Sequence, residues 1–285
     1  NEEENVDCFY EELMKNRRLI MRSHKLPGNK LRLLHTDENR GLVTIDEERD
    51  YRFMYVLEDN FGNRRKYRFT VRGRKQEIPE MKNDSCKTLC WNRTNVIQEP
   101  GMEFVIPRGM LYDDAPLSTA VAGDSSNLSF EYTLDARHTP LHGFCQLAIG
   151  IRNDTLADKS KYYIRNRVGK WTSSVGGKYD NGWMKADIRQ WGNFSVAVDT
   201  IAPSVTPIGQ NLWRTRRDIR FRVSDGQTGI ASYKVLIDGK FVLFALKKGV
   251  LIIQDPDKVK KGVPHTAEVI VADNCGNVTR KQYKF

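Results

Sequence analysis

The sequence predicts an all-β chain of sandwich modules in tandem, with a single helix near its start. Two observations carry this prediction. Runs in which apolar and polar residues alternate recur along the chain, as half-buried strands require. Two of these runs also share one turn, Asp-Asn-x-Gly-Asn, at residues 59–63 and 273–277. With a looser echo at Gly192-Asn193, unit endings near residues 73, 198 and 285 predict three β modules.

The predicted helix spans roughly residues 7–22. Its apolar side chains recur at about the 3.6-residue period of an α-helix. Acidic residues lie in its first turns and basic residues in its last turns, an order that complements the helix dipole. Pro27-Gly28 then ends it.

A short strand is expected at Leu42–Ile45, directly after the turn at Arg40-Gly41. The alternating runs Tyr51–Leu57 and Tyr67–Val71 flank the first shared turn and predict a β-hairpin. A helix and one hairpin are too little for a sandwich. Residues 1–77 are therefore expected to be the C-terminal part of a first β module.

Residues 78–202 are expected to form a larger β-sandwich, and residues 203–285 a second sandwich of about the immunoglobulin size. The joint lies at Asp199–Pro203, where Pro203 and Pro207 stiffen a short extended connector. Strands are predicted in the larger module at Glu103–Ile106, Leu128–Leu134, Phe144–Ile151 and Tyr162–Val168. In the third of these, Cys145 shares a face with apolar residues and is interpreted as a core thiol.

Composition limits the function classes. The 285 residues carry 46 Lys and Arg against 36 Asp and Glu, a net charge of +10. This charge permits an anionic partner, but no DNA- or RNA-binding module signature accompanies it, so nucleic acid is not expected. No apolar run is long enough for a transmembrane helix. The start, Asn1-Glu2-Glu3-Glu4, has neither an initiator Met nor a signal-like segment, which predicts a processed or excised piece.

Histidine, cysteine and carboxylate spacings do not predict a catalytic or metal site. Pro140 separates His138 from His142, and a Pro breaks the helix that would align them. Cys86-x-x-x-Cys90 has no second ligand pair; a local disulfide and two free thiols both stay open. Asp113-Asp114, Asp255/Asp257 and the shared turns are interpreted as solvated turns, with weak calcium binding as the alternative.

Two sets of residues are candidates for binding. The aromatic residues of the larger module could stack on sugar rings; the alternative is that they belong to the core. These are Trp171, Tyr179, Trp183 and Trp191. The basic strand faces could bind an anionic envelope polymer; the alternative is an ordinary solvated face whose charges block edge pairing. These are Lys66, Arg68 and Arg72 on the first hairpin, and Arg220 and Arg222 near the joint of the last module.

Four stretches carry a resemblance to a known family. They are Asn39–Tyr51 continuing through Asp59 to Gln76, then Val105–Asp113, then Gly176–Trp183 with Gly192–Pro203, and last Gly229-Ile230 with Tyr233 and Ile237–Leu243. Together they resemble the non-catalytic C-terminal immunoglobulin-like region of exported lysostaphin-type zinc metalloendopeptidases, the peptidoglycan hydrolases of Gram-negative anaerobes. The resemblance implies tandem immunoglobulin-like β-sandwich modules that follow a peptidase domain.

The zinc ligands of that family are a His-x-x-x-Asp pair and a His-x-His pair, and this sequence has neither. No catalytic residue is therefore carried over, and zinc is expected only in a peptidase domain that this chain lacks. The resemblance implies an accessory region that positions or targets the peptidase to peptidoglycan or an envelope partner. It also implies a periplasmic, outer-membrane-associated or extracellular location. The alternative is a stand-alone adhesin or carbohydrate-binding β-sandwich protein.

Overall fold

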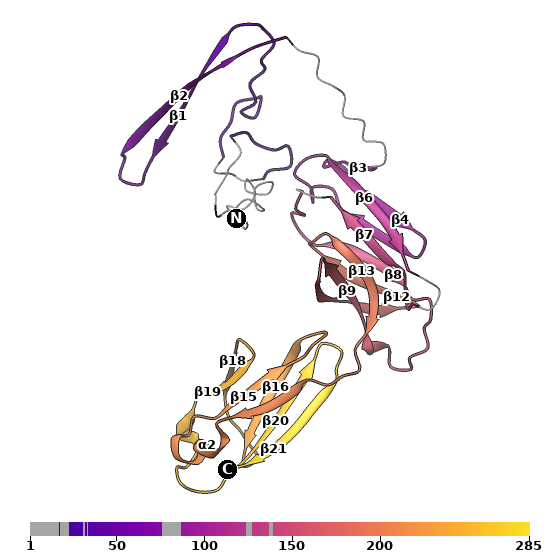
Figure 1. Ribbon diagram of the computed structural model, residues 1–285, viewed down its shortest axis with the longest axis vertical. Helices are drawn as coiled ribbons and strands as arrows, with labels where there is room; N and C mark the ends of the chain where they lie inside the picture. Colours follow the sequence, from indigo (N-terminus) through magenta and orange to yellow (C-terminus); the bar gives the residue numbers. More distant parts are fainter. Residues whose placement is uncertain are drawn as a thin grey trace. The chain divides into compact units, whose positions relative to one another are not determined.

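The computed structural model describes residues 17, 23–30, 32, 34–75, 87–123, 127–136 and 139–285. About half of the residues lie in strands and about 5% in helices, so the predicted all-β class is confirmed (Figure 1). Contacts divide the chain into two compact units, Asn1–Cys86 and Lys87–Phe285. Each unit is described by itself.

The first unit contains one antiparallel hairpin, β1 (Asp50–Glu58) and β2 (Arg64–Arg72), at the predicted position. Successive side chains of a strand point to opposite faces, so one face of this hairpin is aromatic. There the rings of Phe53 and Phe69 stack at 5.1 Å and those of Tyr55 and Phe69 at 5.7 Å.

Two predictions for this unit have other outcomes. The predicted strand at Leu42–Ile45 is wrong: these residues are irregular, and their apolar side chains are exposed. Its alternation was real, but a strand forms only where a neighbouring strand accepts its backbone hydrogen bonds, and no described strand lies beside it. The predicted helix at 7–22 lies, except for Arg17, outside the described residues.

The next module is a sandwich of two antiparallel sheets. One has the order β10-β9-β13-β7-β6-β3 and the other β11-β12-β8-β5-β4. The strands are β3 (Lys87–Leu89), β4 (Asn95–Glu99), β5 (Met102–Ile106), β6 (Ala115–Ala122), β7 (Glu131–Asp135), β8 (Cys145–Gly150), β9 (Tyr162–Val168), β10 (Trp171–Gly176), β11 (Lys178–Asp180), β12 (Trp183–Ile188) and β13 (Gly192–Val198). The short 3-10 helix η3 (Lys159–Lys161) precedes β9. Alternate residues of β8 and β12 are buried, and Phe104, Tyr132 and Leu147 lie at the centre of the core.

The C-terminal module is a second sandwich, with sheets β14-β15-β19-β18 and β17-β16-β20-β21. Its elements are β14 (Ser204–Ile208), α2 (Gln210–Arg216), β15 (Arg220–Ser224), β16 (Ile230–Ile237), β17 (Lys240–Phe241), β18 (Phe244–Lys247), β19 (Val250–Ile253), η4 (Pro256–Lys258), β20 (Thr266–Asp273) and β21 (Val278–Lys284). It has a separate core around Trp213, Phe221 and Val269. The predicted module boundaries near 78 and 202 stay predictions.

The helix α2 was not predicted from the sequence. It has seven residues, too few to show a helical period, and Gly209 at its start makes no side-chain capping hydrogen bond. Its position depends on Trp213, which is fully buried, contacts Phe221 edge to face at 4.9 Å, and donates from Nε1 to the carbonyl of Ile208 at 2.8 Å. Within the described residues, no helix has the length and apolar character needed to cross a membrane.

Candidate functional site

The repeated sequence turn is also a repeated structure. In the first copy, Oδ1 of Asp59 accepts from the amides of Phe61 and Asn63, both at 2.9 Å, and Oδ2 accepts from Asn63 Nδ2 at 2.8 Å. In the second copy, Oδ1 of Asp273 accepts from the amides of Cys275 at 2.9 Å and Asn277 at 2.8 Å, and Oδ2 accepts from Asn277 Nδ2 at 2.8 Å. The Asp and the final Asn of the motif therefore build the turn in both places.

Glycine is needed at the fourth position of each copy. Gly62 and Gly276 have φ angles of 81° and 73°, which disfavour any side chain with a Cβ. In the first copy, the hydrogen bonds from the side chain and amide of Asn63 hold the pKa of Asp59 below its usual value. The carboxylate of this turn is thus charged at neutral pH and is used as a backbone acceptor.

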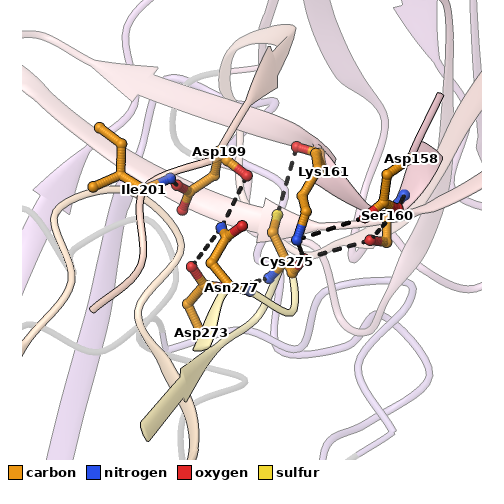
Figure 2. Close-up of polar contacts among 8 residues, drawn as sticks. All are labelled: Asp158, Ser160, Lys161, Asp199, Ile201, Asp273, Cys275 and Asn277. Atoms are coloured by element: carbon orange, nitrogen blue, oxygen red, sulfur yellow. Dashed lines mark hydrogen bonds and ion pairs between the residues drawn. The ribbon is translucent and has the colours of Figure 1, made fainter. Parts of the chain in front are cut away.

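The second copy differs from the first because it lies against the preceding module (Figure 2). Nζ of Lys161, at the end of η3, donates to the carbonyl of Cys275 at 2.9 Å. Nδ2 of Asn277 donates to the carbonyl of Asp199 at 3.0 Å. Cys275, Asp199 and Asp273 are all buried. We call this contact, formed by Lys161, Asp199, Asp273, Cys275 and Asn277, the junction.

A second loop of the C-terminal module completes the junction. Thr228 Oγ1 donates to Asp199 Oδ2 at 2.7 Å, and Asn274 Nδ2 donates to the Thr228 carbonyl at 2.6 Å. Asp225 organises this loop, since its Oδ2 accepts from three successive amides, those of Gln227, Thr228 and Gly229. The residues after β13 therefore contact both the β15–β16 loop and the β20–β21 turn.

Three carboxylates meet at the junction. Asp199, Asp225 and Asp273 each place an oxygen so that the three oxygens lie within 4.8 Å of one another. Oxygen-only sets of this kind suit hard cations such as Ca²⁺. Each carboxylate also accepts the hydrogen bonds described above, and these account for its position, so the cluster by itself does not identify a metal site. Sequence reasoning found only the Asp273 turn, because the other two residues join it through the fold.

The described thiols are two buried and one half-buried. Burial raises the pKa of both Cys145 and Cys275 to about 11, so neither is a thiolate nucleophile at neutral pH. The interpretation of Cys145 as a core thiol is confirmed, since it is buried in the middle core. Cys275 was given no role from the sequence and belongs to the junction. Cys90 is half-buried, and its predicted alternative partner Cys86 lies outside the described residues, as does His138.

The four candidate aromatic residues lie in different surroundings. Trp191 packs edge to face on Phe104 and donates from Nε1 to the Thr139 carbonyl at 2.6 Å. Tyr179 stacks on Tyr162. By contrast, Trp171 on β10 is 84% exposed and Trp183 on β12 is 37% exposed. Strands β10 and β12 belong to different sheets, and among the described residues no ring stacking joins any two of the four.

The candidate basic residues form two separate strand faces, one in each unit. On the hairpin, Arg72 pairs with Asp50 at 3.0 Å across the strands, whereas Lys66 and Arg68 lie opposite Val56 and Met54. On β15, Arg220 pairs with Asp218 at 2.7 Å, and Arg222 lies between Thr206 and Val250. All five are exposed. The acidic partners neutralise part of each face, which leaves Lys66, Arg68 and Arg222 as its cationic residues.

Comparison with known proteins gives one family match. A family model described as a Zu5-like domain matches residues 86–199, which is less than half of the chain and includes all of the middle sandwich. The chain is therefore a β-rich protein with a region similar to Zu5-like domains. No curated protein sequence gives a significant match.

Among solved structures, a similar chain comes from one titled "Ca2+-stabilized adhesin helps an Antarctic bacterium reach out and bind ice". The two are 11% identical, and the alignment covers 83% of this chain and 80% of that chain with a TM-score of 0.18. At this TM-score the likeness supports no conclusion about fold or function.

Proposed function

We propose that this chain is a non-catalytic region that holds a partner domain in position or targets it to an envelope surface. The junction is the observation that carries the proposal. Two sandwiches are joined by hydrogen bonds to a buried backbone, with Lys161 and Asn277 each donating across the contact. A joint of this kind limits relative motion of the two modules, which is the property a spacer or positioning element needs.

The partner follows from the sequence motifs. The resemblance to lysostaphin-type enzymes supports a role as the accessory region of a cell-envelope zinc metallopeptidase. Under this proposal, the zinc and the catalytic residues belong to a peptidase domain elsewhere, and this chain has no cofactor. Its location is the periplasm, the outer membrane surface or the extracellular space, and its binding partner is peptidoglycan or that peptidase domain.

Two measurements on the purified chain test this proposal. Sedimentation with purified peptidoglycan sacculi is expected to deplete the chain from solution, and bovine serum albumin is the control. Zymography on peptidoglycan is expected to show no clearing, with or without added zinc. Zinc-dependent clearing by the chain alone would refute the non-catalytic role, and absence of sedimentation would remove the targeting role.

A stand-alone carbohydrate-binding or adhesin function is the second candidate. The observation that favours it is the exposure of Trp171 and Trp183 on the middle module, since exposed indole rings stack on sugars. A glycan array with the wild type and with Trp171→Ala and Trp183→Ala tests it. Phe144→Ala is the matched control, because Phe144 is also an exposed ring of this module. Glycan binding that only the two Trp variants lose would favour this function over the accessory role.

A further inference from the structure

The two hairpins that carry the repeated turn can be compared residue by residue. Counting outward from the shared Asp, β1 corresponds to β20 and β2 corresponds to β21. The correspondence includes the backbone, since Asp59 donates its amide to the Asn63 carbonyl at 3.1 Å and Asp273 donates to the Asn277 carbonyl at 3.1 Å. The hairpins therefore have the same turn, register and strand polarity.

The corresponding positions differ in burial. Val271, Val269 and Ala267 of β20 are fully buried under the facing sheet of the C-terminal module. Their counterparts on β1 are Leu57, which is 67% exposed, Tyr55, which is 47% exposed, and Phe53, which is half-buried. On the second strand, Phe69 and Val71 are the counterparts of Tyr283 and Phe285, which both pack on the C-terminal core. The aromatic face of β1–β2 thus occupies the positions of a sandwich inner face.

The opposite face corresponds to solvent in both hairpins. Lys66 and Arg68 are the counterparts of Arg280 and Gln282, and all four are exposed. The hairpin is therefore two-sided in the manner of a strand pair in a sandwich, with one apolar and one charged face. A partner is needed on the aromatic face and not on the basic one.

The edge of β1 is open as well. Strand β20 lies between β21 and β16, whereas β1 is paired only with β2 among the described residues. The Asp59–Asn63 bond and the bond from the Gly73 amide to the Arg49 carbonyl fix which amides of β1 face β2. Since alternate residues of an antiparallel strand point their amides to opposite sides, those of Arg52, Met54 and Val56 point to the open edge. Their counterparts in β20 face β16.

We propose that β1–β2 is the closing hairpin of a β-sandwich, and that further β-strands of the same polypeptide, not among the described residues, cover it. One strand pairs antiparallel with β1 as β16 pairs with β20. An apolar sheet covers Phe53, Tyr55, Leu57 and Phe69 as β14-β15-β19-β18 covers the last hairpin. The occupant belongs to the same polypeptide because every strand that covers β20–β21 does so. A two-stranded hairpin is at best marginally stable alone, which gives the physical need for such a partner.

Hydrogen exchange measured by mass spectrometry tests this inference on the gene product purified from its native source and kept monomeric. The chain of 285 residues is measured beside it, and the peptide covering β20 is the internal control in both. We expect the amides of β1 to exchange on the order of 100-fold more slowly in the native protein than in the chain alone, and about as slowly as those of β20. Equally fast exchange of β1 in both proteins would overturn the inference. Protection that appears only when the protein self-associates would also overturn it, because the occupant would then be a second copy.

A pair of neighbouring substitutions separates the two faces. In the native protein, Tyr55→Lys places a charge on the covered face and is expected to remove the protection of β1. Val56→Lys lies on the opposite face and is expected to leave it within about threefold of the wild type, because surface substitutions perturb stability little. Protection of β20 in both variants shows that the rest of the protein is folded. Equal effects of the two substitutions on β1 would contradict the proposed orientation.

Discussion

At the scale of single residues, His265 is the group whose charge state matters most to its surroundings. Its side chain is buried, with Nδ1 at 2.6 Å from Asp238 and Nε2 at 2.8 Å from the Lys260 carbonyl. Burial by itself would lower the pKa of His265, but the hydrogen bonds to Asp238 and Lys260 outweigh it and raise the pKa. The hydrogen bond from His265 lowers the pKa of Asp238. The two groups therefore stabilise each other as an ion pair.

The sign of these shifts predicts a pH dependence. The raised pKa of His265 means that its stabilising effect is complete below about pH 6.5 and is lost as the pH rises through the folded-state pKa. The lowered pKa of Asp238 means that its effect is lost as the pH falls below about 4. We expect thermal melting between about pH 5 and 8.5 to show a decline of no more than about 1 kcal/mol that His265→Gln abolishes. The same decline in His265→Gln would show that another group is responsible.

The thiols give a second prediction at this scale. Cys145 and Cys275 are buried and have pKa values of about 11, so we expect no reaction with maleimide in the folded protein and full reaction in guanidinium. Peptide mass spectrometry after labelling reports each site separately. Labelling of Cys275 in the native protein would mean that the junction opens, and half-buried Cys90 is the comparison site.

At the scale of elements, the repeated turn allows one substitution to be compared in two surroundings. Asp273→Ala leaves two amides and the Asn277 side chain without an acceptor in a buried place, and we expect a cost of about 2–4 kcal/mol. Asp59→Ala removes the same three hydrogen bonds where water replaces them, so its effect is expected to be smaller. Chemical denaturation followed by tryptophan fluorescence measures the first. Hydrogen exchange of β1 and β2 measures the second. An equal loss in both hairpins would mean that burial of the turn contributes nothing.

Elements were predictable where a local pattern determines them. The hairpins follow from alternation around a turn that requires glycine, and both were found. The strand expected at Leu42–Ile45 failed because alternation does not supply a neighbouring strand. The helix α2 was missed because a single buried indole, that of Trp213, fixes it in place of a periodic apolar face. The cluster of Asp199, Asp225 and Asp273 and the Asp238–His265 pair escaped prediction because their members are distant in sequence and meet only in the folded module.

At the scale of the molecule, the junction makes the two sandwiches one unit of stability. Lys161 donates to the Cys275 carbonyl across this contact, and its side chain is mostly buried. We expect Lys161→Met to weaken the contact by about 1–2 kcal/mol, with Lys170→Met, in an exposed turn, as the control.

Scanning calorimetry is the measurement for this prediction. In the wild type, the middle and C-terminal modules are expected to unfold in one transition, since the loss of one exposes the buried carboxylates at the edge of the other. In Lys161→Met, the transition is expected to broaden or divide, while Lys170→Met retains it. Two resolved transitions for these modules in the wild type would show that they are energetically independent.

The Asp-Asn-x-Gly-Asn turn has a practical consequence. Its internal hydrogen bonds are the same to within 0.1 Å whether it projects into water at residues 59–63 or lies beneath a neighbouring module at residues 273–277. The third position is open to substitution, with Phe61 in one copy and Cys275 in the other. Five residues thus form a self-sufficient unit with one variable site, and protein engineers could transplant it to the end of an unrelated hairpin and choose the side chain it displays.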